Sequence, residues 1–172
     1  REGSSQGAAE ILLQIRLPRT LFAALCGAML AGAGVASQGL LRNDLASPSI
    51  LGVTEGGALG AVLCFFLLPQ PLFWWTLPAG AFAGCIIASV SILWLASRHR
   101  SWSTGTLLIA GFALNSLFGS LTSLVLSLML EQQRAAAAMH WLLGGFSGKG
   151  WEHVATLALA AIAGLTLSLI HI

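Results

Sequence analysis

Glu55 is the acidic side chain that lies closest to the interior of a long apolar run, so its chemistry is considered first. A carboxylate at membrane depth is costly unless it faces a cavity, a water-filled path or a partner. Glu55 is therefore a candidate for lining or gating a transport pathway. The alternative is a place near the lipid headgroups at the start of a helix, where a carboxylate complements the positive end of the helix dipole.

Two arginines, Arg16 and Arg19, flank Leu17-Pro18 at the head of another apolar run. Proline is well tolerated in the first turn of a helix, so a helix is expected to begin here with two guanidinium groups at its mouth. Guanidinium groups pair well with carboxylates. The pair could bind acidic groups on a partner protein, or it could anchor the helix in the lipid headgroups.

Motifs of the common enzyme classes are missing from the sequence. There is no H-E-x-x-H, no G-x-S-x-G and no P-loop, so no catalytic residue is predicted, and any ATP that drives the protein must be hydrolysed by another subunit. The cysteines lie in apolar runs without a C-x-x-C pair, and no metal or cofactor is predicted. The histidines lack metal-ligand spacing: His99, His140, His153 and His171.

Composition indicates that lipid is the solvent for much of the chain. Of its 172 residues 56% are hydrophobic and 8% are charged, and the mean hydropathy is +0.85. Soluble domains carry about 25% charged residues. The net charge of +2 comes without a basic run, so nucleic acid is not a predicted partner.

Five apolar runs have a length suited to helices that cross a membrane. They cover roughly residues 17–41, 50–68, 72–97, 106–130 and 151–170. The alternation typical of barrel strands does not appear, and backbone groups in lipid must be satisfied internally. The expected fold is all-α, a polytopic transmembrane helical bundle forming a single domain over 1–172. The distribution of Lys and Arg between the loops does not decide its orientation.

Small residues recur four positions apart in these runs, which favours close helix packing. The pairs are Gly27 with Ala31, Gly56 with Gly60, and Gly80 with Gly84. Residues 135–143 predict a further helix that is too short to span, followed by a glycine-rich loop. It would lie in the membrane interface or re-enter between the spanning helices.

The order of residues from Arg16 to Val53 resembles the permease subunits of ABC importers for iron-siderophores, haem and vitamin B12, the FecCD-type family. That family's pattern is RLPR, a helix of small residues, and then Q-x-L-x-x-N-P-L-A-x-P-x-x-L-G. The segments S-W-S-T-G-T-L-L-I-A-G and W-L-L-G-G-F, the latter followed by Trp151, also resemble family segments. Asp44 stands where the family normally has proline, and Glu55 stands where it has a small or neutral residue.

The resemblance implies roles for individual residues. It places Arg16 and Arg19 at the periplasmic face, where they would dock acidic residues of a substrate-binding protein. It places Asn43 and Leu45 at the cytoplasmic mouth of the pathway, where a capped helix turn is the simpler interpretation. The region of Ser103 and Thr104 would belong to the same gate, although Ser or Thr before an apolar run is also an ordinary helix cap.

The resemblance further implies a type II ABC importer permease in the bacterial inner membrane, of which this chain matches helices two to six. The expected partners are a second permease subunit, identical or different, two ATPase subunits and a periplasmic binding protein. Ferric siderophore is the first choice of substrate, followed by haem and vitamin B12. The alternatives of other classes are an ion-coupled secondary transporter, an intramembrane enzyme and a membrane subunit that transports nothing.

Overall fold

A computed structural model describes residues 7, 9–69, 73–98 and 104–171, and these residues form helices and turns without a strand. Four helices are long and apolar enough to cross a membrane: Ala9–Leu41, Trp75–Leu95, Gly105–Leu128 and Trp151–Ser168. The expected all-α polytopic fold class is thus confirmed. The chain divides into two compact units, Arg1–Leu40 with Gly145–Ile172 and Leu41–Gly144, and each is described by itself. A single domain over 1–172 stays a prediction.

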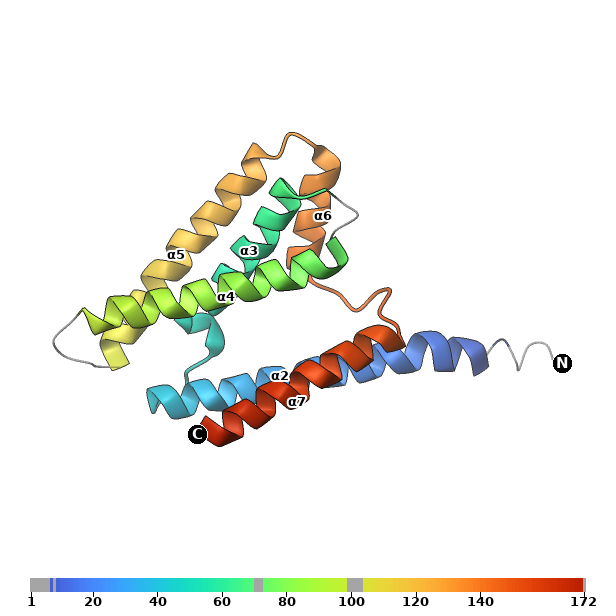
Figure 1. Ribbon diagram of the computed structural model, residues 1–172, viewed down its shortest axis with the longest axis horizontal. Coiled ribbons are helices and arrows are strands. Elements are labelled where there is room, and N and C mark those ends of the chain that lie inside the picture. Colours follow the sequence, from blue (N-terminus) through green and yellow to red (C-terminus); the bar gives the residue numbers. More distant parts are fainter. Residues whose placement is uncertain (1–6, 8, 70–72, 99–103, 172) are drawn as a thin grey trace. The chain divides into compact units, whose positions relative to one another are not determined.

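The first unit consists of α2 (Leu17–Leu41), the π-helical turn Leu12–Arg16 before it, and α7 (Trp151–His171), which lies alongside α2 (Figure 1). The rings of Phe22 and His153 meet edge to face at 6.4 Å. Leu165 packs against Gly32 further along the two helices. Large apolar side chains cover the outer surface of both helices, as expected for a surface that faces lipid or other membrane helices.

The second unit contains the 3₁₀ turn Pro48–Leu51 and four helices: α3 (Val53–Leu67), α4 (Phe73–Ser97), α5 (Thr104–Leu128) and α6 (Gln132–Leu143). Helix α3 contacts α4, α5 and α6 (Figure 1). Phe65, Leu77 and Ala138, one residue each from α3, α4 and α6, form the buried core at the end of α3. The unit is therefore organised around α3.

Helix α3 begins three residues later than the apolar run from residue 50 suggests. Residues 48–51 form a 3₁₀ turn instead, and Gly52 follows with a φ of 72°, which glycine adopts without strain. The 15 residues of α3 are about 22 Å long, shorter than the roughly 30 Å hydrocarbon core of a bilayer. Hydropathy alone did not indicate where the helix begins, because Ile50 and Leu51 of the turn are as apolar as the residues of the helix.

Helices α3 and α4 approach each other so closely that no side chain fits where they cross. A Cβ atom on Gly60 would overlap the carbonyl oxygen of Gly80, and one on Gly84 would overlap that of Gly56. The two glycine pairs predicted to allow close packing in residues 50–97 thus lie face to face. Around Gly27, by contrast, a Cβ would meet nothing within 4 Å, so the predicted pair with Ala31 makes no such contact with described residues.

Candidate functional site

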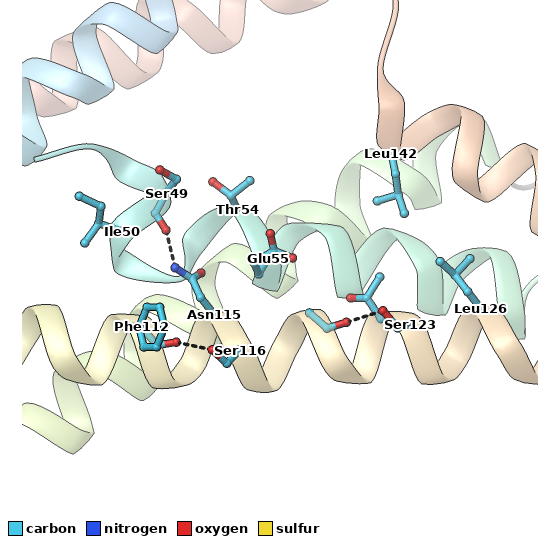
Figure 2. A pocket seen from close by; sticks show the side chains of 12 residues that line it. Ser49, Ile50, Thr54, Glu55, Phe112, Asn115, Ser116, Ser123, Leu126 and Leu142 are labelled. Carbon is cyan, nitrogen blue, oxygen red and sulfur yellow. Dashed lines mark hydrogen bonds between the residues drawn. The ribbon is translucent and has the colours of Figure 1, made fainter.

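An open groove of about 750 Å³ runs along α5 in the second unit (Figure 2). Its lining comes from α5, from the start of α3, from the 3₁₀ turn and from Leu142 of α6. Phe112, Leu126 and Ile50 supply much of its apolar surface. Its polar side chains are Ser49, Thr54, Glu55, Asn115, Ser116, Thr122 and Ser123.

The polar side of α5 follows from its sequence. Asn115, Gly119 and Ser123 are spaced four residues apart, so they lie on one face of the helix. The Ser116 hydroxyl donates to the Phe112 carbonyl and the Ser123 hydroxyl to the Gly119 carbonyl, each at 3.0 Å (Figure 2). These internal bonds satisfy the hydroxyl protons in an apolar setting, while the oxygens remain able to accept a hydrogen bond from a solute.

Glu55 lies in the first turn of α3 and faces α5 across the groove (Figure 2). A Cβ on Gly119 would stand 3.6 Å from Glu55 Oε2, an ordinary contact distance, so the carboxylate lies close to the backbone of α5. Among the described residues none forms an ion pair with Glu55. The position combines both interpretations of the sequence: Glu55 is at a helix start and also lines a groove. Its part in transport stays a prediction.

Asn115 connects the groove to the turn before α3. Its Nδ2 donates to the carbonyl of Ser49 at 2.7 Å, whereas its buried Oδ1 has no hydrogen-bond partner in the described part of the chain. Gly111, one turn earlier on α5, allows the backbone of Ile50 to approach, because a Cβ there would overlap the Ile50 carbonyl. Sequence reasoning missed Asn115, although it is the one amide side chain in the apolar run 106–130.

We expect Asn115→Ala in the full-length permease to lower the free energy of unfolding by about 1–2 kcal/mol, because it removes the bond between α5 and the turn. The measurement is the unfolding temperature in detergent. Ser116→Ala is the matched control, since the Ser116 hydroxyl bonds only within α5. Equal unfolding temperatures for the two variants would contradict the linking role of Asn115.

The predicted gate residues Asn43 and Leu45 lie in one turn. The Leu45 N–H donates to Asn43 Oδ1 at 3.0 Å, and the Ala46 N–H donates to the Asn43 carbonyl at 3.0 Å. The Asn43 side chain thereby closes the turn, and nothing in the structure explains Asp44 in place of the family's proline. The Leu45 side chain is 86% exposed.

Of the other two predicted gate residues, Thr104 alone belongs to the described part of the chain. Ser103 lies outside the described residues, and Thr104 is the first residue of α5. The structure thus brings Asn43 and Leu45 together in one turn. Their shared role stays a prediction.

Arg16 and Arg19 are exposed, one helical turn apart, where the π-helical turn passes into α2. Neither is ion-paired with a described residue. The helix does not begin at Leu17-Pro18 as expected, because helical structure continues back to Ala9. The arginines therefore lie on the side of a continuous helix and not in its first turn.

The π-helical turn has a physical cause in Pro18. The Leu17 N–H donates to the Leu12 carbonyl instead of to Leu13, and Pro18 has no N–H to offer in its place. The Leu13 carbonyl is consequently left without a helical donor. The indole N–H of Trp151, at the start of α7, donates to it at 3.1 Å. Trp151 thus fixes the segment that carries Arg16.

Trp151→Phe keeps the aromatic ring but removes this donor. We expect it to lower the free energy of unfolding by about 1 kcal/mol, because the Leu13 carbonyl loses its partner. Trp75→Phe is the control, since Trp75 is exposed and the same ring change there breaks no hydrogen bond that we find. Thermal unfolding of the full-length permease in detergent measures both, and an equal loss in the two variants would argue against the Trp151–Leu13 bond.

In the described part of the chain no group of three His, Cys, Asp or Glu side chains is placed to hold a metal ion. What the arrangement offers is a largely apolar groove that carries several polar side chains, suited to contact with a solute. In the described part of the chain, fold and groove together define an all-helical protein of the polytopic membrane class, with four helices long and apolar enough to cross a membrane.

The model of the FecCD transport family matches residues 1–172, and the chain belongs to this family. It is 38% identical over 164 residues to the uncharacterized ABC transporter permease protein YvrB of Bacillus subtilis, covering 94% of this chain and 46% of that protein. It is 36% identical over 169 residues to the cobalamin import system permease protein BtuC of Halobacterium salinarum, covering 98% of this chain and 45% of that protein.

Two further similarities agree with this assignment. The Fe(3+)-citrate import system permease protein YfmE of Bacillus subtilis is 38% identical over 151 residues, covering 86% of this chain and 43% of that protein. A solved structure described as a metal-chelate type ABC transporter in an inward-facing conformation superimposes with a TM-score of 0.78 at 28% identity. The match covers 90% of this chain and 48% of that one. The chain spans about half the length of the curated relatives it matches.

Proposed function

We propose that this chain is part of the permease subunit of an ABC importer that moves an iron chelate, in the first place a ferric siderophore, across the bacterial inner membrane. The match to the FecCD transport family over residues 1–172 carries the proposal. The groove between α3 and α5 supports it, because hydroxyl, amide and carboxylate groups line it within a unit of apolar helices.

The proposed assembly contains a second permease subunit, identical or different, two ATPase subunits and a periplasmic binding protein. The ATPase subunits hydrolyse ATP, since this sequence has no P-loop. Exposed Arg16 and Arg19 dock the binding protein. The turn of Asn43 and Leu45, together with Ser103 and Thr104, closes the pathway towards the cytoplasm.

Vitamin B12 is the second candidate substrate, and a specific observation favours it. The Halobacterium relative is named for cobalamin import and covers nearly all of this chain. The Bacillus relative YfmE is named for Fe(3+)-citrate, and the similar solved structure is described as a metal-chelate type transporter. A metal held in an organic chelate is common to all of these substrates.

The test uses the full-length permease with its ATPase and binding protein, in cells that lack their own siderophore and cobalamin permeases. Uptake of ⁵⁵Fe-siderophore and of radiolabelled cobalamin is measured with the normal ATPase and with its P-loop lysine replaced. We expect siderophore uptake that the lysine replacement abolishes. Cobalamin uptake alone would overturn the iron assignment, and uptake that persists without the lysine would overturn the ATP-driven mechanism.

A further inference from the structure

We infer that Glu55 makes the groove selective by charge, so that it favours neutral and cationic chelates and disfavours anionic ones. This inference rests on the proposed function and names the class of substrate. Among the described residues that line the groove, Glu55 is the only Asp, Glu, Lys, Arg or His. The remaining lining is neutral.

In the described part of the second unit no basic side chain pairs with Glu55. In the described part of the second unit the acid–base pair that we find is Arg134 with Glu131, whose Nε and Oε2 atoms are 2.8 Å apart. The groups across the groove from Glu55 are the backbone of Gly119 and the neutral side chains of Asn115 and Ser116. An unpaired charge in a groove with apolar walls acts on a solute more strongly than the same charge in open water.

Metal chelates differ in net charge, so the Glu55 carboxylate attracts some of them and repels others. Three hydroxamate groups neutralise Fe³⁺, and an ammonium arm then makes the complex cationic. Three catecholate groups leave the complex with three negative charges, and citrate complexes are also anionic. Like charges repel, so the groove of this chain is suited to hydroxamate-type chelates and less suited to catecholate or citrate chelates.

The first experiment measures the field in the groove without a transport assay. Ser123→Cys is introduced into the assembled full-length permease with all other cysteines replaced by alanine. The rate of its modification by a cationic thiosulfonate is divided by the rate for an anionic thiosulfonate of similar size. We expect Glu55→Gln to lower this ratio about tenfold, since the two reagents differ by two charges near the carboxylate.

Glu131→Gln is the matched control for this experiment, because Glu131 is exposed and lies outside the groove lining. It should leave the ratio within about twofold of the wild-type value, since an exposed charge is largely screened. A ratio that Glu55→Gln leaves unchanged would overturn the inference.

The second experiment measures selectivity in transport. A linear trihydroxamate chelate of ⁵⁵Fe³⁺ is prepared with its terminal amine free, acetylated or succinylated, which gives a cationic, a neutral and an anionic form of one scaffold. We expect the wild type to take up the cationic form about fivefold faster than the anionic form at equal occupancy of the binding protein, and Glu55→Gln to reduce this preference to about twofold or less.

The outcomes separate the inference from the proposed function. Uptake of all three forms at equal rates, unchanged by Glu55→Gln, would overturn the inference and leave the iron-chelate importer standing. No uptake of any form, in cells where the permease is present in the membrane, would count against the iron assignment itself. Whichever transport result is found, the ratio of thiosulfonate rates tests whether the charge of Glu55 acts on a solute in the groove.

Discussion

Replacing Gly60 by valine in the full-length permease is expected to remove most of the folded protein from the membrane, and Gly60→Ala is expected to lower its unfolding temperature clearly. A Cβ at this position overlaps the carbonyl oxygen of Gly80, which belongs to the backbone of α4 and cannot rotate away as a side chain would. Helices α3 and α4 must then separate. Overpacking of this kind costs about 1–3 kcal/mol or more.

Separation of α3 from α4 would also disturb the groove, because α3 carries Glu55 and packs against α5 and α6. Gly27→Ala is the matched control, since a Cβ there meets nothing within 4 Å. It is expected to be neutral or slightly stabilising, because alanine favours a helix over glycine by about 1 kcal/mol. Membrane content and unfolding temperature in detergent measure both variants, and equal behaviour of Gly60→Ala and Gly27→Ala would refute the close-packing argument.

The sequence allowed the helices to be predicted well where apolar runs end at polar or proline residues. The predicted end of the run 17–41 agrees with the end of α2 at Leu41, where the Arg42-Asn43-Asp44 loop follows, whereas helical structure continues before Leu17 back to Ala9. The start of α3 was missed because Ile50 and Leu51, which belong to the 3₁₀ turn, are as apolar as the helix that follows. Gly52 with its positive φ marks the true boundary.

The candidate site was predictable in part. Glu55 could be selected from the sequence, because a carboxylate in an apolar run needs a polar surrounding. Asn115 could have been found by the same argument. The hydrogen bond from Trp151 to the Leu13 carbonyl could not have been predicted. It forms because Pro18 has no N–H for that carbonyl, and it joins residues 138 positions apart. Such contacts follow from how helices assemble, which the local pattern of residues does not record.

Arg19→Glu is expected to reduce chelate uptake at least about tenfold, and Arg16→Glu with Arg19→Glu to abolish it, if the pair docks the acidic residues of a binding protein. Both side chains are exposed, one turn apart, and neither is ion-paired with a described residue. Charge reversal turns attraction into repulsion, and like charges brought together at an interface cost several kcal/mol. Arg19→Lys keeps the charge and is the matched control, expected to lose much less.

The measurement that separates docking from headgroup anchoring is the affinity of the purified binding protein for the importer in lipid nanodiscs. Docking predicts that the Kd rises with salt in the wild type, because salt screens the attraction. In the double glutamate variant it predicts a higher Kd that no longer rises with salt, because salt then screens a repulsion. Anchoring predicts an unchanged Kd together with a lower amount of inserted permease. Restoration of binding by arginines placed at acidic positions of the binding protein would establish direct pairing, since no effect on membrane insertion could produce it.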